Sequence, residues 1–406
     1  MNLLVIVVDR LHKGYLGPYG NAWVGTGAFN RLAGQSFVFD HVLSDCPDLD
    51  AFYRGCWTGT HALESDSPSR PESLPLRLAS AGMPMTVLYD DPQLDIAWAA
   101  SSLERMDLSP ATATESATTV DDTHLAEVFA STIQWLSEAR GPFSLWIHTQ
   151  GLGGPWDAPP DEYRNRYADE DESPPPPSVV VPRLVLPPDY DPDLLLGYCQ
   201  AYAGQVRLLD DCLGGLLEWL DDSPIGSETL LMVVGARGIA LGEHRRIGAW
   251  DNALHGETIR LPWLMRLGDR SIQACRTQAL AQPADVFPTL LDALGLEVPS
   301  PQSPLGGRSA MPVVRGQQDT LRDRALAMTA QGDRGIRTPA WYLRIAGDHA
   351  IEGDPPGVRN MLYAMPDDRW ETNDVASRCP EVVEELEGAA RDVLSPLSEA
   401  LTNTMR

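Results

Sequence analysis

Basic residues are scarce in this sequence. Its 406 residues include 31 Lys and Arg against 57 Asp and Glu, which gives a formal net charge of −26. A nucleic-acid-binding protein needs a basic surface to neutralise phosphates, and an anionic membrane surface attracts basic segments for the same reason. The charge balance therefore argues against both, and leaves a small anionic ligand or a protein partner open. It says nothing of the oligomeric state.

Long apolar segments and paired cysteines are also missing. No window approaches the ~20 apolar residues of a membrane helix. The apolar run at residues 3–8 is too short for a signal peptide, and no small-residue cleavage site follows it. We therefore expect a cytoplasmic protein without membrane insertion. The six cysteines form no C-x-x-C pair, which indicates reduced thiols and not a disulfide framework or a zinc site.

Short apolar runs do alternate with longer helical patterns along the chain. Several of the runs are apolar on both faces, which is typical of parallel strands covered by helices. This alternation predicts an α/β fold with a large, mainly parallel sheet flanked by helices. The predicted strands are residues 3–8, 85–89, 143–148, 229–235 and 263–267, and the predicted helices are residues 121–140, 191–222 and 285–295.

Changes in composition predict the domain organisation. Residues 168–192 hold an acidic run followed by prolines, which indicates a long loop. Pro and Gly crowd again at residues 300–320, where we place a domain boundary. We therefore expect a main α/β domain over residues 1–315. A smaller C-terminal α+β subdomain should cover residues 316–406, with a few strands and a final helix at residues 380–394.

Several stretches of the chain carry residues typical of one family. They are "LLVIVVDRLHKGYLGPYGN", "YRGCWTG", "LGEH" followed by "ETIRLPWLMR", and "ADVFPTLLDALGLEVPSPQSPLGGRSAMPVVRG". Taken in order, they resemble the sulfatase family of the alkaline phosphatase superfamily. Their order and spacing carry the resemblance, which covers most of the chain. The resemblance implies an alkaline phosphatase/sulfatase-like fold. It also implies sulfuric ester hydrolysis assisted by Ca²⁺ or Mg²⁺ as the family's activity.

The metal ligands that this resemblance implies are mostly replaced. The family binds its cation with an Asp-Asp pair after the first strand and with an Asp and an Asn or His after a later one, in keeping with the hard oxygen ligands that Ca²⁺ and Mg²⁺ require. Here Asp9 remains, Arg10 takes the second position, and the later pair falls on Ala236 and Arg237. Guanidinium groups oppose a bound dication, so no metal or other cofactor is expected and Asp9 is vestigial. We expect Arg10 and Arg237 to neutralise Asp9 and Asp50 in a salt-bridge cluster.

The cysteine form of the nucleophile motif is missing too. Type I sulfatases use a Cys or Ser, oxidised to formylglycine, and the C-x-P-x-R form of their motif does not occur in the chain. Arg54 matches the family's Arg, and counting back four residues reaches Asp50. The stretch "DSPSR" at residues 66–70 fits the same local pattern with Asp66 in place of Cys. Asp50 and Asp66 therefore both remain candidates for the nucleophile position.

Other candidate site residues follow the predicted strands. Asp90 and Asp91 stand where the family's sulfate-binding cations fall, and would repel a sulfate ester. His148 at a strand end is a candidate base, although a buried hydrogen-bonded role is favoured. His244 follows Glu243 directly and His255 lies two residues before Glu257, so a rebuilt metal site is an alternative to structural roles for these histidines.

Two functions remain open. The first is a catalytically inactive pseudosulfatase with a binding or assembly role, which the missing motifs favour. The second is a divergent hydrolase of sulfate, phosphate or related esters with a rebuilt active site. That hydrolase would need a nucleophile and a base, and the candidates are Asp50 or Asp66 with His148 or His244.

Overall fold

The computed structural model describes residues 1–64, 72–109, 112–169, 172, 174–301, 303–347, 352, 354, 357 and 360–404. Internal contacts divide the chain into two compact units. Unit 1 consists of residues 1–39, 78–249 and 261–276, and unit 2 of residues 40–77, 250–260 and 277–406. Both units are discontinuous in the sequence, whereas the boundary that we expected near residue 315 divides the chain once. Each unit is described by itself.

Unit 1 is built on a mainly parallel sheet. Its strands follow the order β10-β7-β1-β5-β3-β4. β1 pairs in parallel with β5 and β7, and β3 pairs in parallel with β5 and β4, whereas β10 is antiparallel to β7. The strands are β1 (Asn2–Val8), β3 (Met85–Tyr89), β4 (Leu103–Asp107), β5 (Ser144–Thr149), β7 (Thr229–Gly235) and β10 (Arg260–Arg266), while β2 (Phe37–Leu43) and β11 (Cys275–Ala281) run along the chain from this unit into unit 2.

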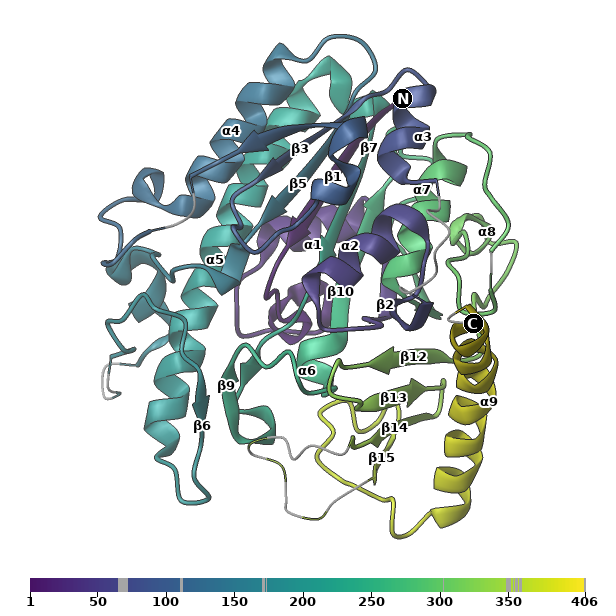
Figure 1. Ribbon diagram of the computed structural model, residues 1–406. Coiled ribbons are helices and arrows are strands. Elements are labelled where there is room, and N and C mark those ends of the chain that lie inside the picture. The colour runs from purple at the N-terminus through teal and green to yellow at the C-terminus, as the bar shows by residue number, and fades with distance from the viewer. Residues whose placement is uncertain are drawn as a thin grey trace. The chain divides into compact units, whose positions relative to one another are not determined.

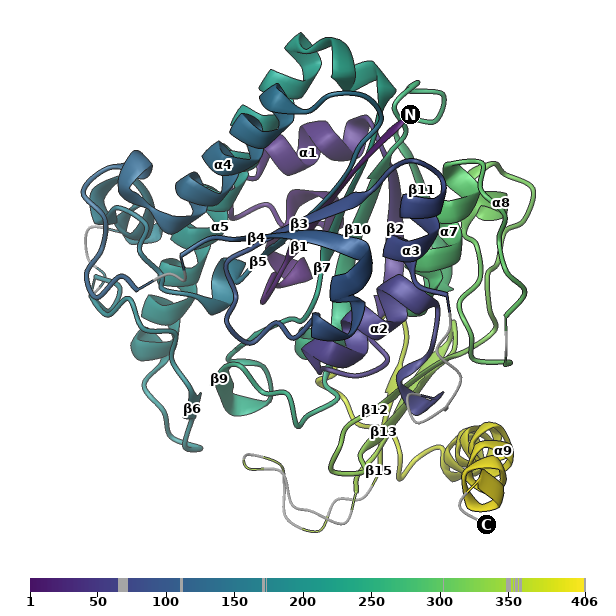
Figure 2. The same ribbon diagram turned by 45° about the horizontal axis from the view of Figure 1, so that its top comes forward.

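Three helices cover one face of this sheet (Figure 2): α1 (Gly27–Gly34), α4 (His124–Glu138) and α5 (Pro192–Asp222). Alternate residues of β1, namely Leu4, Ile6 and Val8, are buried in one apolar cluster with residues of these helices. The two-residue period of a strand puts these side chains on the same face. The α/β class expected from the sequence is confirmed. None of the helices in the described part of the chain is long and apolar enough to cross a membrane.

The segment 168–192 is a loop for most of its described length, as expected, but it contributes one short strand. β6 (Leu184–Val185) pairs with β9 (Arg246–Gly248), which pairs in turn with β8 (Ala240–Leu241). The buried guanidinium of Arg164 donates to the carbonyls of Pro176, Pro177 and Ser178. Proline has no N–H of its own to donate, so side-chain donors of this kind fix the proline run in place.

Unit 2 contains an antiparallel sheet in the order β12-β13-β14-β15. The helix α9 (Pro380–Thr404) lies beside this sheet (Figure 1) and packs Leu386 and Ala390 against buried residues of it. The remaining helices of the unit lie earlier in the chain, and α2 packs against α7. The elements are α2 (Leu49–Thr58), α6 (Gly256–Ile259), α7 (Val286–Ala293), α8 (Met311–Val314), β12 (Ala325–Met328), β13 (Arg334–Arg337), β14 (Trp341–Ile345) and β15 (Asn360–Ala364), while α3 (Leu74–Ser80) runs from this unit into unit 1.

Candidate functional site

Asp9 and Arg237 meet where two neighbouring strands of unit 1 end. The parallel register pairs Val8 of β1 with Gly235 of β7, and the amide of Ala236 donates to the carbonyl of Val8 at 3.1 Å. The residues that follow these two strands therefore lie at the same level. Arg237 Nε donates to Asp9 Oδ1 at 3.0 Å and Arg237 Nη2 donates to Asp9 Oδ2 at 2.6 Å. The predicted ion pair between them is present, with the two parallel hydrogen bonds that suit a guanidinium and a carboxylate.

The carboxylate of Asp9 is held in its ionised form by this pairing. Asp9 is buried, and burial by itself raises the pKa of a carboxyl group. The charges of Arg237 and Arg10 and the hydrogen bonds from Arg237 outweigh burial and lower the pKa of Asp9 to about 2. Arg10 is the more distant cation, with its Nε at 3.6 Å from Oδ2.

The backbone at Arg10 is locked in an unusual conformation. Arg10 has a φ of 56°, in the left-handed region that a residue with a side chain seldom adopts. The hydroxyl of Tyr202 donates to the carbonyl of Arg10 at 2.8 Å and accepts from the amide of His12 at 2.7 Å. This buried tyrosine of α5 therefore fixes the turn that follows β1.

The glycines after β5 leave no room beside this turn. A Cβ atom at Gly153 would lie 2.7 Å from Cγ of Arg10, and one at Gly151 would lie 2.6 Å from Cγ1 of Val8 and 2.9 Å from the carbonyl oxygen of Asp9. The stem of Arg10 thus fills the space that a side chain at position 153 would need.

Because of this close approach, Gly153→Ala should destabilise the protein by about 1–3 kcal/mol, the range for overpacking. The loss should largely disappear when Arg10 is also replaced by Gly, since the clashing Cγ is then gone. Urea denaturation of the two single variants and the double variant measures this coupling. Gly215→Ala is the control, because a Cβ at this position of α5 meets no atom within 4 Å. Equal losses from Gly153→Ala with and without Arg10 would contradict the packing described.

Asp90 and Asp91 at the end of β3 each bind a histidine. Asp90 accepts from His124 Nε2 at 2.7 Å, from Thr149 Oγ1 at 2.8 Å and from the amide of Gln150 at 2.6 Å. His148 Nε2 lies 3.3 Å from Asp91 Oδ2. The sequence indicated these two aspartates only as groups that repel sulfate. In the structure Asp90 accepts donors from β5, from the residue that follows it and from α4, so it holds one edge of the sheet together.

The pairing with carboxylates shifts the pKa values at this edge. Burial lowers the pKa of His124, but the hydrogen bond and charge of Asp90 outweigh burial, so that the pKa is raised. Burial raises the pKa of Asp91, but the hydrogen bond from His148 outweighs it and the pKa is lowered. Neither His124 nor its pairing with Asp90 was anticipated from the sequence. His148 was anticipated as a candidate base, and that role stays a prediction.

Asp50 and Arg54 lie on α2 in unit 2. Asp48 caps this helix by accepting from the amide of Ala51 at 2.9 Å, and Arg54 Nε donates to Asp50 Oδ2 at 2.7 Å, one helical turn away. Both side chains are about 40% exposed. The structure thus brings together the two residues matched to the family's nucleophile turn. Asp66, the alternative, lies outside the described residues.

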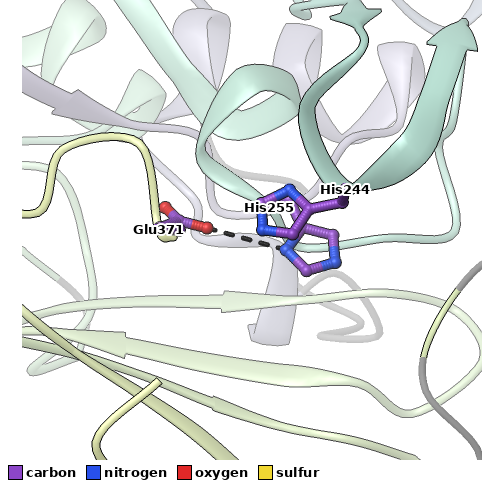
Figure 3. A group of neighbouring side chains, drawn as sticks. All are labelled: His244, His255 and Glu371. Carbon is purple, nitrogen blue, oxygen red and sulfur yellow. Dashed lines mark ion pairs between the residues drawn. The ribbon is translucent and has the colours of Figure 1, made fainter. Parts of the chain in front are cut away.

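His244 and His255 lie in different units. His244 belongs to a short 3-10 helix of unit 1, Glu243–Arg245, and has a φ of 51°. His255 precedes α6 in unit 2, where its Nδ1 lies 3.6 Å from Oε2 of Glu371 (Figure 3). The same carboxylate oxygen accepts from the amide of Gly256 at 3.0 Å. Glu371 therefore binds the first amide of α6 as well as the imidazole.

Comparison with known proteins identifies the class. The model of the Sulfatase family matches residues 1–296. The multifunctional alkaline phosphatase superfamily protein PehA of Trinickia caryophylli is 30% identical over 112 residues, 27% of this chain and 21% of that protein. The N-acetylglucosamine-6-O-sulfatase of Bacteroides thetaiotaomicron is 29% identical over 127 residues, 31% of this chain and 22% of that protein. The matched stretches thus span less than a quarter of either relative.

Solved structures share the fold over nearly the whole chain. The phosphonate monoester hydrolase of Agrobacterium radiobacter aligns with a TM-score of 0.73 and 18% identity, over 98% of this chain and 95% of that one. A 2-O GAG sulfatase, BT1596, aligns with a TM-score of 0.75 and 17% identity, over 99% and 93%. The fold is that of the alkaline phosphatase superfamily. Within that superfamily, the chain belongs to the Sulfatase family, which confirms the resemblance noted in the sequence.

This membership corrects one expectation. Members of the family are metalloenzymes that use a divalent cation, so the expectation that no cofactor is needed was wrong. Asp9 as arranged does not fit such a cation, because both of its oxygens accept from Arg237. In unit 2, His255 and Glu371 place one ligand atom each within 4.8 Å of one another, and imidazole and carboxylate are ligands of divalent transition metals.

Proposed function

We propose that this chain is a pseudosulfatase: a member of the Sulfatase family that no longer hydrolyses esters at the family site and uses the retained fold to bind a small anionic ligand or a protein partner. The observation that supports this most directly is the bidentate pair between Asp9 and Arg237. A carboxylate that accepts from a guanidinium through both oxygens has its charge neutralised in place, which opposes the binding of a dication there. The absence of the C-x-P-x-R motif from the sequence supports the same proposal.

A second candidate function is supported by the pair on α2. Asp50 and Arg54 stand one helical turn apart, as the nucleophile and Arg of the family's motif do, and their side chains are in contact. A carboxylate can act as a nucleophile. On this alternative the chain is a hydrolase of sulfate, phosphate or related esters with Asp50 in the position of formylglycine.

Turnover of aryl sulfate and aryl phosphate esters distinguishes the two functions. The assay compares the full chain with its Asp50→Ala and Arg54→Ala variants, each with and without Ca²⁺, Mg²⁺, Mn²⁺ and Zn²⁺. We expect no turnover above that of contaminants, equal in all three proteins. Turnover of the unaltered chain that either substitution abolishes would contradict the pseudosulfatase proposal and favour the hydrolase. Asp121→Ala, an exposed position on unit 1, is the control for loss of activity by any acidic residue.

A further inference from the structure

Both carboxylate oxygens of Asp9 accept hydrogen bonds from the guanidinium group of Arg237. We propose that Asp9 forms a binding site for a guanidinium group, and that the side chain of Arg237 is its permanent occupant. This inference rests on the proposed function, because both treat Asp9 as a carboxylate already engaged by a cation. It goes further in naming the chemical class that the site recognises, a planar cation with paired N–H donors.

The shape of the contact is specific to a guanidinium group. Nε and Nη2 of Arg237 lie on one edge of the planar guanidinium, and each donates to a different oxygen of Asp9, at 3.0 and 2.6 Å. A point charge such as an ammonium cannot reproduce two parallel hydrogen bonds of this kind. Both side chains are nearly fully buried, so the contact is made away from bulk water, where paired charges interact more strongly.

Arg10 is not able to take over this role. Its Nε is 3.6 Å from Asp9, beyond hydrogen-bond distance, and its Nη1 donates to the carbonyl of Gly238 at 3.3 Å. Its backbone is held by Tyr202, and its Cγ sits against Gly153. Arg10 therefore contributes charge near Asp9 but is fixed outside the bidentate position.

Removal of the occupant should consequently leave a site that free guanidinium can enter. In an Arg237→Gly variant of the full chain, Asp9 stays buried without its two donors, and the thermal unfolding midpoint should fall by about 5 °C or more. Guanidinium chloride at a low concentration, up to about 20 mM, should raise that midpoint in a saturable way, because a ligand that binds only the folded state stabilises it. At this concentration guanidinium is far too dilute to denature the protein.

Matched controls separate binding from other effects of the salt. Urea has a similar planar shape without the charge, and NaCl at the same ionic strength supplies charge without the shape; neither should raise the midpoint of Arg237→Gly. Arg10→Gly removes an arginine from the same neighbourhood but leaves the bidentate pair in place, and it should not respond to guanidinium. The unaltered chain should not respond either, since Arg237 fills the site.

Three results would overturn the inference. In the first, guanidinium fails to raise the thermal unfolding midpoint of Arg237→Gly, and in the second it raises the midpoints of all variants equally. The third result is a larger rise in the midpoint of Arg237→Gly with Mg²⁺ or Ca²⁺ than with guanidinium. If Arg237→Gly does not accumulate as folded protein, it is produced with and without guanidinium, and recovery with guanidinium but not with urea is the expected result. An Arg237→Lys variant as stable as the unaltered chain would also overturn the inference, because a point charge would then serve as well. Ester turnover by the unaltered chain refutes the proposed function but leaves these readouts unchanged, so the two failures are distinguishable.

Discussion

An Asp90→Ala variant is expected to lose about 3–5 kcal/mol of the free energy of unfolding, the range for breaking a buried ion pair by removing one partner. Asp90 is buried and accepts from three donors: the imidazole of His124, the hydroxyl of Thr149 and the amide of Gln150. All three would lose their acceptor at once, in a place where water cannot readily replace it. Urea denaturation measures the loss.

The pH dependence of this loss has a definite sign. His124 has a raised pKa in the folded protein. A raised folded-state pKa contributes stability that is fully present below the unfolded value of about 6.5 and is lost as the pH rises through the folded-state pKa. The difference between the unaltered chain and Asp90→Ala should therefore be larger at pH 6 than at pH 9. The pKa of His124, followed by NMR, should fall in the variant, because Asp90 is the group that raises it.

Two comparison variants test whether the buried carboxylate is responsible. Asp90→Asn keeps the size and one acceptor oxygen but removes the charge, and should lie between the unaltered chain and Asp90→Ala. Asp121→Ala removes an exposed aspartate of the same unit and should change the free energy of unfolding by no more than about 0.5 kcal/mol. If Asp90→Ala were as mild as Asp121→Ala, Asp90 would not hold this edge together.

Local sequence patterns were sufficient to predict several strands of unit 1, although not β4 at Leu103–Asp107. Residues 3–8, 85–89 and 229–235 read as strands, and the structure has β1 at Asn2–Val8, β3 at Met85–Tyr89 and β7 at Thr229–Gly235. Each is a short, nearly continuous apolar run, the clearest signature of a buried parallel strand. The ion pair between Asp9 and Arg237 was expected from the metal-ligand positions that the family resemblance implies, and the structure places both residues directly after adjacent parallel strands.

These local patterns did not predict the contact between the end of β3 and the start of α4. Asp90 and His124 are 34 residues apart, and a link between them depends on where the start of α4 lies, which no local signal specifies. The helix itself was predicted over residues 121–140, and α4 covers His124–Glu138, capped by the side chain of Thr123, which accepts from the amide of Ala126 at 3.3 Å. The sequence therefore predicted the helix α4 correctly, but not that its first residue lies beside the end of β3.

A buried arginine in unit 2 escaped prediction for a different reason. The C-terminal subdomain was expected to hold a few strands, and β14 covers Trp341–Ile345. Arg344 in its middle is fully buried, although arginine is among the residues least often buried. Its partner Asp333 lies just before β13, and the antiparallel register that pairs Gly335 with Arg344 brings the two together. Only the register of the two strands reveals this pair.

Replacement of Arg344 should therefore lower the free energy of unfolding by a large amount. Arg344 Nε and Nη2 donate to Asp333 Oδ2 at 3.0 and 2.7 Å, and Nη1 lies 2.7 Å from Asp354 Oδ2. Arg344→Met keeps most of the apolar stem but takes the positive charge away from both carboxylates. We expect a loss of about 3–5 kcal/mol in the free energy of unfolding by urea, because Asp333 is left buried without its guanidinium.

The matched control for this variant lies on the neighbouring strand. Arg334→Met makes the same chemical change at an exposed position of β13 and should cost no more than about 0.5 kcal/mol. Combining Arg344→Met with Asp333→Asn should cost less than the sum of the two single losses, by about 1 kcal/mol or more, since residues in one ion pair are not additive. Additive losses, or an Arg344→Met variant as stable as Arg334→Met, would show that the pair does not stabilise the sheet. A non-additive result would instead show that unit 2 depends on this buried pair, as the edge of unit 1 is expected to depend on Asp90.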